Sequence, residues 1–250
     1  MHSKLGSLLA AAISFGIAQS AWAADLPARP VYKAPVAIPV TPTWTGFYIG
    51  GHAGYGWSST DWGFPATGFY NPAPGMGFST DPKGFMGGVH GGYNYQIGTW
   101  VFGLEASYDP TKMKQTLVGP VTPIYPTDTF TTKVGELLTV TGRIGYASAN
   151  WLLYVKGGWA NARVQLDAIS GPPVAGVTAA VGKHSNGGTL GVGAEYMITP
   201  NIIAGVEYDW VRLQSASFSS LTSNSAPFII GRDSTDIHMV LGRLSFKFSQ

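Results

Sequence analysis

The sequence predicts an all-β fold, an eight-stranded antiparallel up-and-down transmembrane β-barrel. Eight segments alternate apolar and polar residues with a period of two, which indicates β-strands with two different faces. Long and short connections between these segments alternate strictly, as in outer-membrane barrels with short periplasmic turns and longer outer loops. The chain is also poor in charge, with 11% charged residues, against about a quarter in an ordinary soluble domain.

Residues 1–23 have the features of a cleaved secretory signal peptide. Lys4 supplies the positive charge, residues 8–17 the apolar core, and Ala21-Trp22-Ala23 the cleavage motif with a small residue on either side of a large one. No run of about 18 apolar residues follows, which argues against a transmembrane helix. Because only helices and closed barrels satisfy every backbone polar group in lipid, the exported chain is expected to close into a barrel.

The mature chain is almost neutral. Without Lys4 it retains 14 Lys and Arg residues against 13 Asp and Glu residues, a net charge of +1. A nucleic-acid partner is recognised largely through neutralisation of its phosphates by Lys and Arg. No nucleic-acid partner is therefore expected.

Residues 24–43 are predicted to form a Pro-rich periplasmic tether. Five prolines are spaced through this segment, and it has few residues that could pack into a core. At roughly 3.1 Å per residue in polyproline geometry, it could reach about 60 Å. The alternative is a disordered N-terminal segment without a task.

Residues 44–248 are predicted to form the barrel domain. Its first strand is expected at 44–57, and the last at 236–248 carries Phe246 and Phe248 at its end. The other six strands are expected at about 85–96, 100–108, 138–146, 151–159, 189–198 and 204–210. Short turns are predicted at 97–99, 147–150 and 199–201, and long irregular loops at 58–83, 109–133, 167–186 and 213–235.

Charged side chains on the predicted strands lie on the face opposite the aromatic residues. A cation pointing at lipid near the midplane would cost about 2–4 kcal/mol, and an eight-stranded barrel is just wide enough to be filled by its own side chains. These charges are therefore expected to face the lumen and to pair in a plug near mid-barrel. Separate solvated charges at the barrel ends are the alternative. The predicted lumenal charge network comprises Glu105, Arg143, Lys156, Glu195, Glu207, Asp209, Arg243 and Lys247.

His52 and His90 fall on the same lumenal face, and counting through the turn at 97–98 places His90 roughly opposite Glu105. A metal or haem half-site is one interpretation. Two histidines without a thiol or a third imidazole nearby make a weak ligand set. Hydrogen-bonded filling of the lumen is therefore expected, with no metal and no cofactor.

A short cluster before the last strand has the residue types of a hydrolase. Asp233, Ser234, Asp236 and His238 are close in sequence, but a catalytic site needs the nucleophile beside its base in space. The chain is therefore not expected to be an enzyme.

Several short motifs of the mature chain are shared with a known family. They are Ala24-Asp25-Leu26-Pro27, Lys33-Ala34-Pro35, Trp44-Thr45-Gly46-Phe47-Tyr48-Ile49-Gly50, Ala53-Gly54-Tyr55-Gly56-Trp57, Gly91-Gly92-Tyr93-Asn94-Tyr95-Gln96, Thr199-Pro200-Asn201, Val206-Glu207-Tyr208 and Gly242-Arg243-Leu244. In these motifs the chain resembles the small outer-membrane β-barrel proteins of alpha-proteobacteria, the major surface antigens of rhizobia and brucellae, often classed as a porin family. The match covers essentially the whole mature chain and is most specific at the first strand.

The resemblance implies an abundant structural protein of the Gram-negative outer membrane, in contact with lipid and lipopolysaccharide and inserted by the barrel-assembly machinery. It also implies that the start at Ala24 and Asp25 is a site of attachment to peptidoglycan. Two features depart from the family pattern. Ser249 and Gln250 follow the final aromatic residue, and His52 and His90 stand where family members tend to carry neutral amides.

The function expected from these observations is structural: a barrel that maintains envelope integrity and is tethered to peptidoglycan through its mature N-terminus. One alternative is a porin-like channel for small solutes, which sustained large conductance would reveal. Another is a surface protein that binds haem or a host ligand through its long loops, which loop deletion with retained folding would reveal. The oligomeric state is left open.

Overall fold

The structure is a computed structural model that describes residues 43–65, 75–120, 126–172 and 176–248. The described residues form ten antiparallel β-strands and no helix that is long and apolar enough to span a membrane. The strands are β1 (Gly46–Gly63), β2 (Gly77–Thr80), β3 (Lys83–Ile97), β4 (Trp100–Val118), β5 (Thr129–Ser148), β6 (Trp151–Ile169), β7 (Thr178–Thr199), β8 (Ile202–Leu213), β9 (Ala216–Leu221) and β10 (Pro227–Lys247). The predicted signal peptide and residues 24–42 of the predicted tether lie outside the described residues, as do Ser249 and Gln250.

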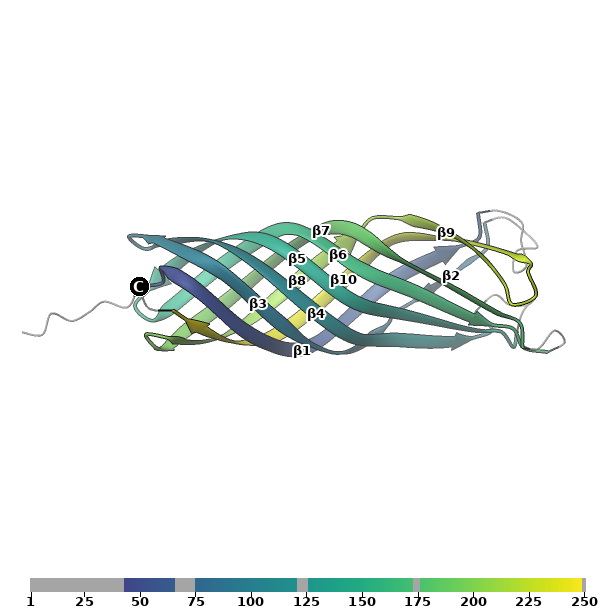
Figure 1. Cartoon of the computed structure of the whole chain (residues 1–250), viewed down its shortest axis with the longest axis horizontal. Helices are drawn as coiled ribbons and strands as arrows, with labels where there is room; N and C mark the ends of the chain where they lie inside the picture. Colours follow the sequence, from purple (N-terminus) through teal and green to yellow (C-terminus); the bar gives the residue numbers. More distant parts are fainter. Residues whose placement is uncertain (1–42, 66–74, 121–125, 173–175, 249–250) are drawn as a thin grey trace, which may run out of the picture. The chain divides into compact units, whose positions relative to one another are not determined.

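The sheet closes on itself into a barrel (Figure 1). Its order is β2-β1-β3-β4-β5-β6-β7-β8-β10-β9, and β1 also pairs with β10. The short strand β2 pairs with β1 beyond the end of β3 and therefore occupies the same position in the ring as β3. In the same way, β9 pairs with β10 beyond the end of β8 and shares the position of β8. The ring therefore contains eight strand positions, which confirms the predicted all-β, eight-stranded antiparallel barrel.

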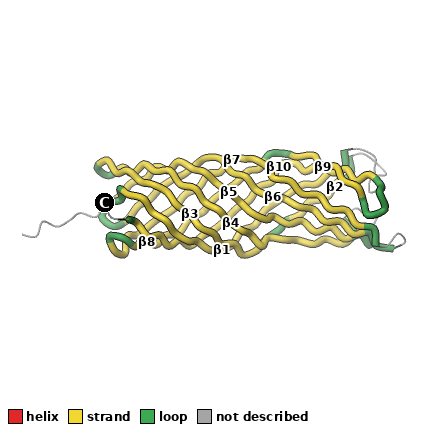
Figure 2. The backbone as a smooth tube through the Cα atoms, in the orientation of Figure 1, coloured by secondary structure: helices red, strands yellow, loops and turns green. Residues whose placement is uncertain are grey.

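The tight turns all lie at one end of the barrel, beside the C-terminus, and the longer connections lie at the other (Figures 1 and 2). In the turn between β3 and β4, Gly98 has φ +61°, a left-handed conformation that glycine adopts without steric cost. The strict alternation of turn lengths in the sequence corresponds to this asymmetry. We refer to the half of the barrel next to the tight turns as the inner half and to the other as the outer half.

The strands are longer than predicted, and this part of the sequence interpretation was wrong. Strand β5 has 20 residues and β7 has 22, whereas a strand needs only about 9–11 residues to cross a membrane. The segments predicted as long irregular loops are largely strand. β1 continues to Gly63, β4 to Val118 and β6 to Ile169, and β10 begins at Pro227.

In the inner half, the side chains that point away from the lumen are mainly apolar. On β6, for example, the exposed side chains Trp151, Leu153, Val155 and Trp159 point away from the lumen. The same pattern recurs on the neighbouring strands, where exposed large hydrophobic residues include Phe47, Ile49, Phe102, Leu104, Val140, Ile144, Val192, Val206, Leu244 and Phe246. This half has the outward apolar band and inward polar residues of a membrane-spanning barrel.

The outer half reverses this polarity. Its inward side chains form a buried apolar core that includes Trp62, Phe64, Phe78, Met113, Phe130, Val164, Leu166, Phe218, Phe228 and Ile230. The outward positions of β6 beyond Trp159 are instead polar, with Asn161, Arg163 and Gln165 alternating with the buried residues. The sequence interpretation assigned most of these residues to irregular loops and did not predict this buried core. Strands with a polar outer face and a buried apolar inner face are packed as in a water-soluble protein.

A second apolar cluster fills the inner end of the lumen. Trp44 is 0% exposed, and its backbone N–H donates to Gln96 Oε1 at 2.7 Å. The Lys247 ammonium donates to the carbonyl of Thr43. The cluster consists of Trp44, Val101, Ala147, Leu152, Tyr154, Met197 and Ile203. Trp44 is thus held inside the barrel end, close to the start of the described residues.

Candidate functional site

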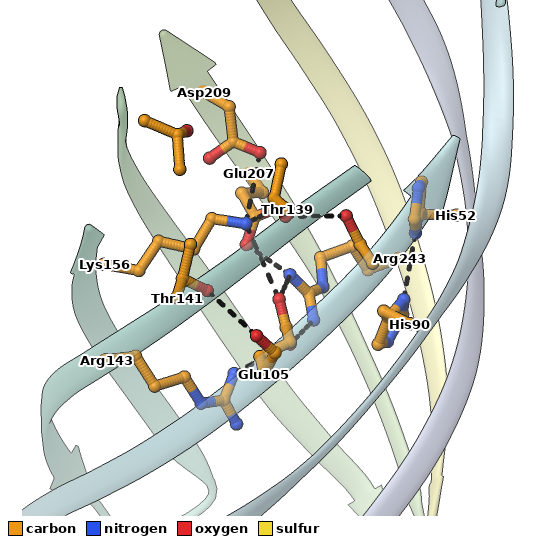
Figure 3. A network of polar contacts seen from close by, with 12 residues as sticks. His52, His90, Glu105, Thr139, Thr141, Arg143, Lys156, Glu207, Asp209 and Arg243 are labelled. Carbon is orange, nitrogen blue, oxygen red and sulfur yellow. Dashed lines mark hydrogen bonds and ion pairs between the residues drawn. The ribbon is translucent and has the colours of Figure 1, made fainter. Parts of the chain in front are cut away.

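Seven charged side chains meet in the lumen between the two apolar clusters, and Figure 3 shows all of them except Glu195 with labels. Their side chains are at most 6% exposed. They are contributed by Glu105 (β4), Arg143 (β5), Lys156 (β6), Glu195 (β7), Glu207 and Asp209 (β8) and Arg243 (β10). Each occupies an inward position in the two-residue alternation of its strand, and that places the charges away from lipid. We refer to these seven residues as the lumenal plug.

Arg243 is at the centre of the lumenal plug. Its guanidinium donates through Nη1 to Glu105 Oε1 at 3.0 Å and contacts the second Glu105 oxygen through Nη2. Nη1 also donates to Glu207 Oε2, and Nε lies 3.8 Å from Glu195 Oε1. One guanidinium therefore links carboxylates from three strands, which the planar fork of arginine suits well.

Arg143 is the second arginine of the plug and contacts the carboxylates of Glu195 and Glu105. Its Nη1 donates to Glu195 Oε1 at 3.0 Å and lies 3.8 Å from Glu105 Oε2. Its Nε donates to Asn94 Oδ1 at 2.8 Å. The guanidinium also lies 4.7 Å from the ring centroid of Tyr48 and 5.0 Å from that of Tyr154. Stacked contacts of this kind add cation–π attraction to the ion pairs.

Lys156 is the third cation of the plug. Its ammonium donates to Glu207 Oε1 at 2.7 Å and lies 3.2 Å from Asp209 Oδ2 and 3.5 Å from Glu105 Oε1. Two glycines of β7 make room for it and its neighbours. A Cβ added at Gly191 would lie 2.0 Å from Asp209 Oδ1, and one at Gly193 would lie 2.4 Å from the Tyr154 hydroxyl. The glycines of this strand therefore define the space that the plug fills.

The plug brings together seven of the eight charges in the predicted network and leaves out Lys247. This lysine lies at the inner end of the barrel, against the Thr43 carbonyl. Sequence reasoning missed Tyr48, whose hydroxyl donates to Glu105 Oε2 at 2.9 Å, and Tyr154, whose hydroxyl donates to Glu207 Oε2 at 2.5 Å. Both stand at lumen-facing positions of the two-residue alternation, a signal that could have identified them.

The two predicted histidines lie beside the plug and are joined in one hydrogen-bonded chain. His52 and His90 approach through their Nδ1 atoms at 3.0 Å. His52 Nε2 contacts the Asp109 carboxylate, and His90 Nε2 lies 2.7 Å from the Ser245 hydroxyl. If His52 donates to Asp109, His90 to His52 and Ser245 to His90, every contact is satisfied with both imidazoles neutral.

His90 does not lie opposite Glu105 as predicted. It pairs with Ser107, and Glu105 pairs with Gly92. The tight turn is centred one residue later than the count assumed, which brings Ile97 opposite Trp100 and shifts each pairing by two residues. In the described ranges no group of three or more His, Cys, Asp or Glu residues could hold a metal ion. The histidine contacts are those of side chains that fill the lumen.

The cluster of Asp233, Ser234, Asp236 and His238 lies within β10, on the outer face of the barrel. The hydroxyl of Ser234 accepts from Arg212 Nη2 at 3.4 Å, and His238 Nδ1 lies 2.8 Å from the Tyr208 hydroxyl. Asp236 accepts from Trp210 Nε1 at 3.0 Å. These contacts place different partners beside the serine and the histidine, so they do not form the nucleophile–base pair that catalysis would need.

The arrangement as a whole is a lumen filled along its length. From the tight-turn end it contains the Trp44 cluster, the lumenal plug with the histidine chain, and the apolar core of the outer half. Buried charges are tolerated here because each of the seven lies within ion-pair distance of at least one opposite charge. The fold and the site therefore define a membrane-spanning β-barrel whose interior is packed with side chains.

The chain belongs to the outer membrane protein beta-barrel domain family, whose model matches residues 7–248. This membership places it in the Gram-negative outer membrane, surrounded by lipid and lipopolysaccharide. No curated protein sequence matches the chain.

Solved structures that match the chain include three outer-membrane or surface proteins. The outer membrane protease OmpT of Escherichia coli matches with a TM-score of 0.54 and 11% identity, covering 83% of this chain and 98% of that one. OprG of Pseudomonas aeruginosa matches with a TM-score of 0.46 and 11% identity, covering 82% and 97%. Neisserial surface protein A matches with a TM-score of 0.44 and 12% identity, covering 82% and 98%. At these identities the similarity to OmpT shows the fold alone.

Proposed function

We propose that this protein is a structural component of the outer membrane that maintains envelope integrity and conducts no solute. The observation that supports this most strongly is the lumenal plug, in which charges from six strands meet in the membrane-spanning half of the barrel. Apolar clusters fill the lumen on both sides of it. A barrel filled in this way is suited to a mechanical role in the membrane and leaves a porin-like role without support.

The proposal includes a tether from the barrel to the cell wall. Cleavage of the signal peptide after Ala23 would leave Ala24-Asp25 as the mature start, joined to peptidoglycan, and residues 24–43 would span the periplasm. Trp44 buried in the barrel end and Lys247 bound to the Thr43 carbonyl support this idea. Tension on the segment would act on the packed interior of the barrel and not on a frayed end.

Two further parts of the proposal concern origin and assembly. The motifs around Trp44 and Gly50 support a place among the small surface barrels of alpha-proteobacteria, with insertion by the barrel-assembly machinery. The protein is proposed to have no enzymatic activity, which the separate hydrogen-bond partners of Ser234 and His238 support.

Mass spectrometry of muropeptides tests the tether. Digested sacculi from cells producing the full chain are expected to contain a peptide that starts at Ala24 and is joined through its amine to a peptidoglycan stem peptide. The variant Asp25→Asn keeps the barrel unchanged and is expected to lower the linked fraction. Sacculi that release only peptides with a free Ala24 amine would refute the tether.

A further inference from the structure

The outer face of the barrel carries a continuous row of polar and aromatic side chains across five adjacent strands. Strand pairing sets His238 (β10) opposite Trp57 (β1), and Trp57 opposite Lys83 (β3). Lys83 in turn faces Lys114 (β4), which faces Lys133 (β5). All five are outward positions of their strands. We refer to them as the rim row.

The three lysines of the rim row repel one another. Like charges directly opposite each other on a sheet are destabilising. Lys133 is paired with the Asp167 carboxylate at 2.6 Å. Among the ion pairs of the described residues, none includes Lys83 or Lys114. Two adjacent cations of the rim row are therefore free to bind an anion from outside the chain.

The rim row lies at the outer boundary of the apolar band. Phe85, two residues from Lys83 on the same face of β3, is 74% exposed. Beyond Lys83, the next exposed residue on the same face is Asp81. On β4, Lys114 lies beyond the exposed Tyr108. Aromatic residues of barrels mark the membrane–water interface. The lysines are thus placed at the level of lipid headgroups.

One end of the rim row borders a hollow of about 520 Å³, lined by Tyr55, Trp57, Ser58, Ser59, Asp81, Lys83 and His238. The rings of Trp57 and His238 are stacked with centroids 5.7 Å apart and planes inclined by 16°. The volume is in the range of small-molecule sites. Its walls combine an aromatic face and a cation with hydroxyl and carboxylate groups that can bind sugar hydroxyls.

We propose that the rim row binds the phosphorylated sugar headgroup of an anionic glycolipid in the outer leaflet. Lys83 and Lys114 bind a phosphate, which neutralises the repulsion between them, and the attached sugar packs against Trp57 in the hollow. This inference goes beyond the proposed function. It needs only the location of the barrel in the outer membrane, and it does not depend on the plug or the tether.

The test measures binding of lipid A to the purified full-length mature protein in nanodiscs of phosphatidylcholine. The variant Lys83→Gln/Lys114→Gln removes both unpaired cations and keeps the side-chain length. The matched control Arg163→Gln/Lys183→Gln removes two exposed cations from β6 and β7. Because each lysine near an anionic surface contributes about 1 kcal/mol, we expect the rim-row variant to lose affinity by about tenfold or more and the control by about threefold or less.

Two further comparisons separate a headgroup site from general attraction to anions. Dephosphorylated lipid A is expected to bind the wild type about as weakly as lipid A binds the rim-row variant. Trp57→Leu is expected to weaken binding of lipid A but not of phosphatidylglycerol, which lacks a sugar.

Equal losses in the rim-row and control variants, or unchanged binding of lipid A by the rim-row variant, would overturn the proposal. Heat resistance in phosphatidylcholine alone serves as the folding control. Since the variant removes like-charge repulsion, it is expected to unfold at the same temperature as the wild type or a higher one.

Discussion

Replacing Arg243 with methionine is expected to lower the free energy of unfolding of the barrel by about 3–5 kcal/mol, the usual cost of removing one partner of a buried ion pair. Arg243 faces Glu105, Glu207 and Glu195. Its loss leaves these carboxylates with only two cations, Arg143 and Lys156, in a lumen without bulk water. The measurement is the urea midpoint of the refolded barrel in lipid bilayers.

Arg212→Met provides the matched control for this change. The Arg212 side chain is 58% exposed and lies 3.7 Å from Asp236, and exposed pairs contribute only about 0–1 kcal/mol. The double variant Arg243→Met/Glu105→Leu should recover part of the loss, since it removes one carboxylate together with its partner. Similar costs for the Arg243 and Arg212 variants would contradict a plug that holds the strands together.

Phe130→Ala is expected to cost about 3–5 kcal/mol, the range for truncating a fully buried aromatic residue. Phe130 is 0% exposed in the core of the outer half, with its ring 4.8 Å from that of Phe78. The control is Phe102→Ala, which shortens an outward side chain in the apolar band. Protease resistance of the outer half and the unfolding midpoint together report the effect.

The outcome distinguishes a packed outer half from a set of loose loops. If the outer half is a folded extension with its own core, Phe130→Ala exposes new cleavage sites in the outer parts of β5 and β7, while Phe102→Ala does not. A Phe130 variant as resistant and as stable as the wild type would contradict a core around Phe130 that holds the outer half together.

The sequence predicted the inner half well because one physical signal dominates it. Lipid on one side and a narrow lumen on the other force apolar residues out and charges in, so the two-residue alternation located seven plug residues on the correct face. Position along the strand was less certain. The predicted position of His90 opposite Glu105 is wrong because an error of one residue in the centre of a tight turn shifts the register of the entire hairpin.

The outer half was misread because its alternation carries the opposite meaning. In β5 the outward residues near Lys133 are polar, and the inward residues Phe130 and Val134 are apolar. These segments lack the outward apolar stripe of a membrane strand, and their polar composition therefore predicts loops. A search for period-two alternation with either face apolar would have found them.

The partners of individual side chains could not be predicted from one strand at a time. That Arg243 contacts Glu105 depends on closure of the ring between β10 and β1, which brings together residues 138 positions apart. The rim row likewise exists only because the registers of four strand pairs align outward cations and aromatic rings. Such contacts depend on the shear of the closed barrel, which no single strand encodes.

Single-channel recording in planar bilayers tests the central claim, a lumen closed by side chains, most directly. We expect the purified, refolded barrel to give no sustained openings, because the Trp44 cluster, the lumenal plug and the outer apolar core fill the lumen of the described barrel one after another. Stable, large, ohmic openings of the wild-type protein would contradict this account.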